Sequence, residues 1–214
     1  MYNGCNKTYG KGGMFMYRYV AIERQFCSGG QEVASILAKK LGYKLYDHEV
    51  LVETANRLEL PAIYISDLEE TASTNPLFNL SQTALGGLSK KKNIPLSEQI
   101  FHAEKQVILD VAKDQNCVFV GRCAGDILKE EDCLRVFIYA DDSFRLQRAR
   151  NKEKIPMEKV ESELKRVDKR RSDFFTSHTG SKWGSKEFFP ISLNSATLGV
   201  EACAEILAAA VKNH

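Results

Sequence analysis

The sequence has no feature that marks a membrane, secreted or nucleic-acid-binding protein. No apolar run approaches the ~20 residues needed to span a bilayer, and polar residues break up the N-terminal stretch where a signal peptide would lie. The formal net charge is only +2, from 30 basic and 28 acidic residues, so no overall basic excess attracts nucleic acid. We therefore expect neither a membrane nor a nucleic acid among the partners.

Cysteine and histidine are too scattered to form a recognisable metal site or disulfide framework. The six cysteines show no paired CxxC spacing, and the four histidines form no HxxxH pair and have no credible serine or cysteine partner. We expect reduced thiols in a cytoplasmic protein, with no metal-ligand set among its side chains.

The length and composition predict one globular domain. The chain has 214 residues, of which 43% are hydrophobic, enough for an ample core. Residues 1–16 are rich in glycine and polar residues, so we expect a disordered leader there, with Met14 or Met16 as alternatives to Met1 as the true start. The folded domain is expected over residues 17–214.

The rest of the chain is organised around a glycine turn between a strand and a helix. An apolar run at 19–22 predicts a buried strand, and Ser28-Gly29-Gly30 leads directly into an amphipathic helix that Gly42 ends. This order brings free backbone N–H groups and the positive end of a helix dipole to one point, which suits a phosphate. A tight turn without a ligand is the alternative.

The glycine turn lacks the residues of a regular phosphate-binding loop. A P-loop reads GxxxxGK[ST], in which the lysine contacts the β- and γ-phosphates and the hydroxyl binds magnesium. Here Gly30 stands in the lysine position, Gln31 and Glu32 follow where the hydroxyl should be, and Cys27 replaces a further usual glycine. The nearest lysines lie more than two helical turns further on, too far to serve the loop.

The remaining chain predicts an α/β fold with a five-stranded parallel sheet covered by helices on both faces. The expected strands are 19–22, 44–46, 117–120, 134–139 and 191–193. Ligands of such sheets bind beyond the carboxyl ends of the strands. The polar residues expected at that edge are Ser28, Arg122, Asp141 and Asn194.

Residues 61–93 interrupt this pattern of strands and helices. The segment is weakly patterned and contains Pro76, a Gly86-Gly87 pair and the basic run Lys90-Lys91-Lys92. It is either a substrate flap or a solvated helical excursion. Nucleic-acid binding through this run or through residues 165–171 is disfavoured, because no aromatic residues alternate with the basic ones.

A charge pair is expected on the core-facing side of the helix that starts at Pro156. Helical spacing places Asp168 and Arg171 on the side of Leu164 and Val167. The pair is either a structural ion pair at the edge of the core or a ligand group, in which Arg171 reaches a substrate phosphate and Asp168 orients it.

Three further arginines are candidates for the site. Arg122 directly follows a buried strand and a glycine, which favours a role at the ligand edge over a surface salt bridge. Arg145 and Arg148 lie one helical turn apart, and a solvated basic face is the alternative to a site role for both.

Several stretches of the sequence resemble the cytidylate kinase-like family of P-loop proteins, relatives of bacterial cytidylate kinase. They read AIERQFCSGGQE with KLGYKLYD, VFVGRCAGDIL with RVFIYA, VDKRRSDFFTSHTGSKWG, and ISLNSATLG. Their common order over nearly the whole chain is more specific than the glycine loop alone. The resemblance implies the nucleoside monophosphate kinase fold, a P-loop NTPase fold, with a nucleotide-binding flap at about 61–93 and an arginine-bearing lid at about 145–180.

The resemblance also implies roles for single residues. Arg122 is similar to the arginine of cytidylate kinase that holds the CMP phosphate, and Asp168 with Arg171 resembles its Asp-x-x-Arg motif. Arg145 and Arg148 correspond to lid arginines. Cytidylate kinase itself has an aspartate where this chain has Cys123 and a complete GKGT loop where this chain has Gly30-Gln31-Glu32, although a glycine loop without lysine is usual in the cytidylate kinase-like family.

Two functions follow as hypotheses. The first is transfer of the γ-phosphoryl group of ATP, with Mg²⁺, to a nucleoside monophosphate such as CMP or to another small acceptor. Arg24, just before the loop, is the candidate to replace the lysine, and Arg148 is the second catalytic candidate. The second is a nucleotide-binding module without catalysis, because the lysine is missing and Glu32 would repel a triphosphate.

Overall fold

A five-stranded parallel sheet forms the centre of the computed structural model, which describes residues 16–61 and 94–213. The strand order is β2-β3-β1-β4-β5, and every pair of neighbouring strands is parallel. The strands are β1 (Tyr19–Arg24), β2 (Lys44–Tyr46), β3 (Cys117–Val120), β4 (Cys133–Tyr139) and β5 (Ile191–Asn194). The predicted fold class and all five predicted strands are confirmed, with β1, β4 and β5 slightly longer than expected.

Eight helices are found in the described residues. They are α1 (Gly30–Leu41), α2 (His48–Leu58), α5 (Leu96–Asp114), α6 (Ala124–Ile127), α7 (Asp142–Asn151), α8 (Met157–Thr179), α9 (Ser195–Leu198) and α10 (Val200–Lys212). The one-turn helices α6 and α9 were not predicted, because four residues carry no hydrophobic periodicity. Helix α8 continues past the predicted Phe175 and ends only at Gly180, whose φ of 69° gives the left-handed conformation that closes a helix.

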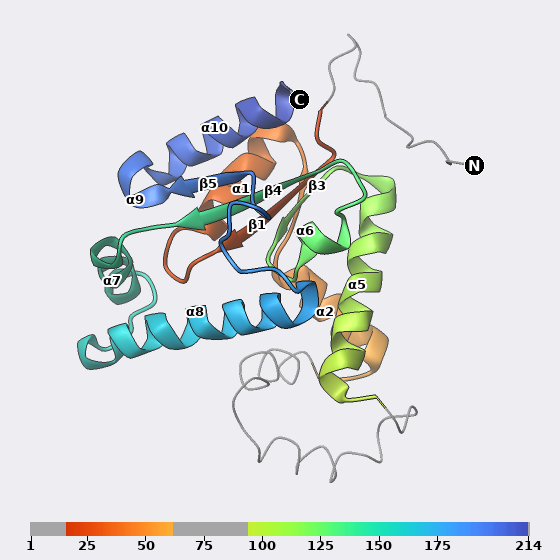
Figure 1. Ribbon diagram of the computed structural model, residues 1–214, viewed down its shortest axis with the longest axis horizontal. Helices are drawn as coiled ribbons and strands as arrows, with labels where there is room; N and C mark the ends of the chain where they lie inside the picture. The colour runs from red at the N-terminus through yellow and green to blue at the C-terminus, as the bar shows by residue number, and fades with distance from the viewer. Residues whose placement is uncertain (1–15, 62–93, 214) are drawn as a thin grey trace.

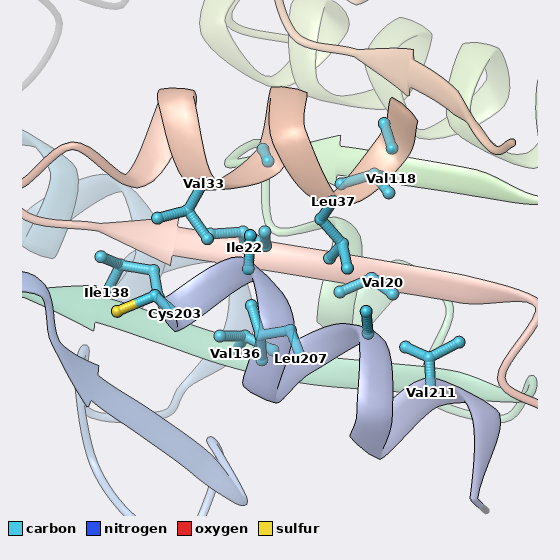
Figure 2. Close-up of a cluster of buried hydrophobic side chains, with 14 of the residues drawn as sticks. Val20, Ile22, Val33, Leu37, Val118, Val136, Ile138, Cys203, Leu207 and Val211 are labelled. Carbon is cyan, nitrogen blue, oxygen red and sulfur yellow. The ribbon is translucent and has the colours of Figure 1, made fainter. Parts of the chain in front are cut away.

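The two faces of the sheet are covered by different helices. Side chains alternate along a strand, so Val20 and Ile22 of β1 point to one face, whereas Tyr19 and Ala21 point to the other. Helices α1 and α10 cover the first face, where Leu37 and Leu207 are completely buried (Figure 2). Helices α2, α5 and α6 cover the second face (Figure 1).

Helix α8 lies on the opposite side of the sheet from α10 (Figure 1). Its C-terminal half is fixed by aromatic packing, in which Phe175 contacts Phe188 edge to face and His178 stacks on Phe101 of α5 at 3.8 Å between ring centroids. This packing brings one side of α8 against the loop that follows β1. It thereby places the residues of α8 that the sequence singled out next to the glycine loop.

Two predicted segments fall largely outside the described residues. They are the leader at 1–16, of which only Met16 is described, and the flap at 61–93, of which only Pro61 is described. No helix in the described part of the chain is long and apolar enough to cross a bilayer.

Candidate functional site

The loop between β1 and α1 has a fixed backbone of the kind that surrounds phosphates. Cys27 and Gly29 both have positive φ angles, 59° and 81°, and α1 begins at Gly30. Ser28 is completely buried, and its hydroxyl lies 2.9 Å from the carbonyl oxygen of Gln25 and 3.2 Å from that of Ile138. The serine therefore holds the loop against β4 and does not face a ligand.

Cys27 is not a nucleophile at neutral pH. Burial and, to a smaller extent, the negative charge of Glu153 raise the pKa of its thiol to about 11, against the opposing effect of Arg148. Because the thiolate is the reactive form of cysteine, the protonated thiol contributes only shape to the loop.

Arg24 and the loop glycines fit together closely. A Cβ atom at Gly30 would lie 2.5 Å from the Cβ of Arg24, and one at Gly121 would lie 2.5 Å from its Nη1 atom. A side chain at either position would therefore meet Arg24. The stem of Arg24 runs past the start of α1, and its guanidinium group lies beside the turn that follows β3.

Arg24, Arg122 and Arg171 come together and form a three-arginine cluster at the carboxyl edge of the sheet. Burial is the main cause that lowers the pKa of Arg122 to about 9, and the positive charge of Arg24 is the second. The pKa of Arg171 is lowered to about 9 by the same two causes in the same order. Guanidinium groups stay protonated at neutral pH even so, and three of them held together favour an anion between them.

Negative charge at the back of the cluster offsets part of the repulsion. Glu23, only 7% exposed, raises the pKa of both Arg122 and Arg171, and its carboxylate accepts a hydrogen bond of 3.3 Å from the indole N–H of Trp183. Glu23 was not predicted as a site residue, although an acidic residue directly after an apolar run could have indicated one.

Helix α8 holds the loop through Asp168. Its carboxylate accepts a hydrogen bond of 2.7 Å from the backbone N–H of Phe26 and one of 2.5 Å from Arg145, which also donates to the carbonyl of Phe26 at 3.3 Å. Asp168 and Arg145 together thus bind both the backbone N–H and the carbonyl of Phe26. Arg171, on the next turn of α8, donates to the carbonyl of Arg24 at 3.0 Å.

Asp168 and Arg171, which the sequence predicted as a pair, have different partners in the structure. Asp168 pairs with Arg145, and Arg145 is only 6% exposed, so the alternative of a solvated basic face is wrong for this arginine. As described, Arg145 and Asp168 fix the loop. The role of Arg145 as a lid arginine, and of Asp168 as a substrate group, stay predictions. Arg171 is the member of the predicted Asp-x-x-Arg pair that lies at the cluster.

A cavity of about 100 Å³ lies over the loop, and we call it the loop cavity. Four basic side chains line it, those of Arg24, Arg148, Lys152 and Arg171. The remaining lining residues are Gln25, Phe26, Cys27, Gly29, Gly30, Gln31, Glu32 and Glu153. The predicted loop residues except Ser28 therefore line one space together with the predicted catalytic pair Arg24 and Arg148.

Glu32 is bound to two cations at the rim of the loop cavity. Arg148 contacts its Oε1 atom at 2.8 Å, and Lys152 donates to the same oxygen. Burial opposes ionisation of this carboxyl, but the hydrogen bonds from Lys152 and Arg148 lower the pKa of Glu32 below its ordinary value. Lys152 was not predicted; it lies just past the end of α7, one turn after Arg148.

Glu104 of α5 is a buried carboxyl beside the three-arginine cluster. It is completely inaccessible, its Oε1 atom lies 3.4 Å from Arg122, and its Oε2 atom has no hydrogen-bond partner among the described residues. Burial raises the pKa of Glu104 well above its ordinary value. Helical spacing was a signal for it, since residue 104 falls on the same face as Ile100, Val107 and Ile108.

Carboxylates that could assist a divalent cation are few. Asp47 stands at the N-cap of α2 but makes no side-chain capping bond there, and its carboxylate instead accepts a hydrogen bond of 2.5 Å from Gln31 of α1. In the described part of the chain no three His, Cys, Asp or Glu side chains are grouped so that they could hold a metal ion.

Comparison with known proteins gives the same family as the motifs. The sequence profile of the cytidylate kinase-like family matches residues 19–197. The chain belongs to this family. No curated protein matches the sequence.

Solved structures extend the comparison to the fold of this family member. A protein from Eubacterium ventriosum, described only as uncharacterized, aligns over 92% of this chain and 99% of its own with a TM-score of 0.67 and 22% identity. The shikimate kinase of Bacteroides thetaiotaomicron aligns over 90% and 97% with a TM-score of 0.53 and 11% identity. That of Acinetobacter baumannii, solved with shikimate, aligns over 88% and 89% with a TM-score of 0.50 and 14% identity. The family member thus has a P-loop kinase-like fold.

Proposed function

We propose that this protein transfers the γ-phosphoryl group of ATP to a small anionic acceptor, with a nucleoside monophosphate such as CMP as the first candidate. The observation that carries the proposal is the three-arginine cluster of Arg24, Arg122 and Arg171 directly beside the loop cavity. Phosphoryl transfer requires mainly positioning and neutralisation of charge on the transferred group. Converging guanidinium groups meet both requirements.

The loop cavity is the proposed site of the triphosphate. The first backbone N–H groups of α1 and the positive end of its dipole face this cavity and favour phosphate oxygens. Arg148 and Lys152 supply further positive charge at this cavity. Arg24 takes the part of the absent lysine, because it is the one member of the cluster whose stem starts at the loop itself.

The acceptor is proposed to bind at Arg122 and Arg171. A guanidinium group can donate two parallel hydrogen bonds to a phosphate or a carboxylate, so the cluster selects for an acceptor that carries one of these groups. The Acinetobacter enzyme, which binds shikimate, makes a carboxylate acceptor a second class to test. Arg24, between the two sites, would contact the group that is transferred.

Mg²⁺ is part of the proposal through the class of reaction. When bound, it would bridge the phosphates of ATP and withdraw charge from them. The chain offers Glu32 at the rim of the loop cavity and Asp47 beside Gln31, and oxygen ligands of this kind suit Mg²⁺. Most of its ligands would be phosphate oxygens and water.

The proposed compartment is the cytoplasm, where ATP and nucleoside monophosphates are available. All five cysteines in the described residues, namely 27, 117, 123, 133 and 203, are free thiols. Free thiols are typical of a reducing compartment.

The test is an assay for diphosphate formation. Purified protein with ATP, Mg²⁺ and each nucleoside monophosphate in turn, and with shikimate as a further acceptor, is followed by ³¹P NMR. We expect ADP and one phosphorylated acceptor from the wild type and a strongly reduced rate from Arg24→Ala. Binding of ATP and of an acceptor without any product would contradict transfer.

A nucleotide-binding module without catalysis is the second candidate. It is favoured by Gly30 in the lysine position and by Glu32, which holds two of the cations that a triphosphate would need. This function predicts that calorimetry detects ATP binding while the NMR assay detects no product. Product formation by the wild type, abolished by Arg24→Ala, would exclude it.

A further inference from the structure

Glu32 occupies an unusual position for an acidic residue in a phosphate-binding cavity. It lies in the first turn of α1, at the rim of the loop cavity, and its side chain is 39% exposed. Its Oε1 atom contacts both Arg148 and Lys152. The single negative charge of Glu32 therefore offsets part of the charge of the two cavity cations outside the three-arginine cluster.

The charges around the loop cavity are only partly balanced. The basic side chains are Arg24, Arg148, Lys152 and Arg171, and the acidic ones are Glu32 and Glu153. If phosphates take Arg148 and Lys152 from Glu32, its carboxylate is left beside a polyanion without a cationic partner. Such a contact between like charges weakens binding.

A divalent cation removes this conflict. Mg²⁺ prefers carboxylate and phosphate oxygens, so it can lie between Glu32 and the phosphate chain and attract both. The residue that would supply a metal-binding hydroxyl in a regular P-loop is here Gln31, whose amide nitrogen donates to Asp47. Glu32 is the lining carboxylate next to that position in the chain.

We propose that Glu32 makes the loop cavity selective for the magnesium complex of a nucleoside triphosphate over the free nucleotide. In this arrangement the carboxylate exchanges Arg148 and Lys152 for the metal ion, and the two basic side chains turn to the phosphates. The inference rests on the proposed function, since it assumes that the loop cavity binds a triphosphate. It adds the form of the nucleotide that the site accepts and the residue that imposes it.

Calorimetry on Glu32→Gln tests the inference. Dissociation constants for ATP are measured for wild type and variant, once with excess Mg²⁺ and once with EDTA. We expect wild type to bind ATP much more weakly in EDTA. Glu32→Gln should bind free ATP about tenfold to a hundredfold more tightly than wild type does, the range of one or two charge-assisted contacts, and should lose most of its preference for Mg²⁺.

Two control variants exclude less specific explanations. Glu205→Gln also removes one negative charge from a contact with α1, since Glu205 pairs with Lys40 at 2.5 Å, but it lies outside the loop cavity and should bind ATP as wild type does. Glu32→Asp keeps the carboxylate and should keep the preference for Mg²⁺.

The outcomes separate this inference from the proposed function. If wild type and Glu32→Gln both bind ATP and show the same ratio of affinities with and without Mg²⁺, the selectivity assigned to Glu32 is wrong and the nucleotide site stands. If neither protein binds ATP under either condition, the proposed function fails, and the inference fails with it.

Discussion

Gly30 leaves free the space that the stem of Arg24 occupies. A Cβ atom at Gly30 would lie 2.5 Å from the Cβ and 3.0 Å from the Cγ of Arg24, closer than real Cβ atoms approach their neighbours. The stem of the arginine thus fills the space in which a P-loop lysine would begin. Arg24 itself stands five residues before Gly29, where the GxxxxGK pattern has its first glycine. The absence of a lysine at position 30 and the presence of an arginine at position 24 therefore depend on each other.

This relationship predicts that a lysine at position 30 will not restore a P-loop. Gly30→Lys should lower the free energy of unfolding by about 1–3 kcal/mol, because the new Cβ meets the stem of Arg24. The double variant Gly30→Lys with Arg24→Gly should recover much of the lost stability. Thermal unfolding of the three proteins measures this. A fully stable single variant would show that the two residues do not compete for space.

The contacts of Asp168 predict a structural loss when it is removed. Asp168→Ala leaves the Phe26 N–H without its acceptor and removes the less exposed of the two carboxylates that pair with Arg145, so we expect a loss of about 3 kcal/mol in the free energy of unfolding. Asp168→Asn should cost less, because an amide oxygen can still accept from Phe26.

Denaturant titration measures this loss, with Asp173→Ala as the matched control. Asp173 lies on the same helix and pairs with Lys169 at 2.5 Å in a solvent-exposed position, where an ion pair contributes about 0–1 kcal/mol. Equal losses for Asp168→Ala and Asp173→Ala would contradict the role of Asp168 in holding the loop.

Glu104 predicts a dependence of stability on pH. Burial raises its pKa, so the folded protein keeps this proton at pH values where the unfolded chain has released it. Its stabilising contribution is therefore complete below the ordinary pKa of a glutamate and is lost as pH rises through the raised pKa of the folded state. Arg122, 3.4 Å away, opposes the effect by favouring the carboxylate.

The measurement is the free energy of unfolding between pH 5 and about pH 9, the range over which a buried carboxyl titrates. We expect it to fall with rising pH in wild type and to fall less in Glu104→Gln, whose amide cannot ionise. The same slope in both proteins would mean that Glu104 does not titrate over this range.

The sequence predicted the fold because its signals are local. Four-residue apolar runs such as Cys117–Val120 mark buried parallel strands, and a glycine after an amphipathic stretch, such as Gly42, marks the end of a helix. The order of strands, helices and family motifs was then enough to place Arg122 and the glycine loop at the same edge of the sheet.

The partners of the charged residues were not predictable in the same way. Helical spacing placed Asp168 and Arg171 on the inner side of α8, which is correct. It also predicted that these two residues, one turn apart, pair with each other. Asp168 instead pairs with Arg145, 23 residues away on another helix, through a contact that only tertiary packing creates. The buried carboxyl of Glu104 escaped attention because charged residues at core positions are rare.

The role of Arg171 predicts a loss of affinity without a loss of stability. Arg171→Ala removes charge-assisted hydrogen bonds to the acceptor, and it also relieves repulsion from Arg24 and Arg122. Its guanidinium also donates one hydrogen bond to the carbonyl of Arg24, at the end of β1. Arg166→Ala, on the exposed side of the same helix, is the matched control and should bind the acceptor as wild type does.

The dissociation constant of CMP for Arg171→Ala, measured by calorimetry together with the melting temperature, tests the three-arginine cluster most directly. We predict an increase in the CMP dissociation constant of about tenfold to a hundredfold and a melting temperature close to that of wild type. A large fall in melting temperature with unchanged CMP affinity in the folded fraction would contradict the account, because Arg171 would then be a structural residue.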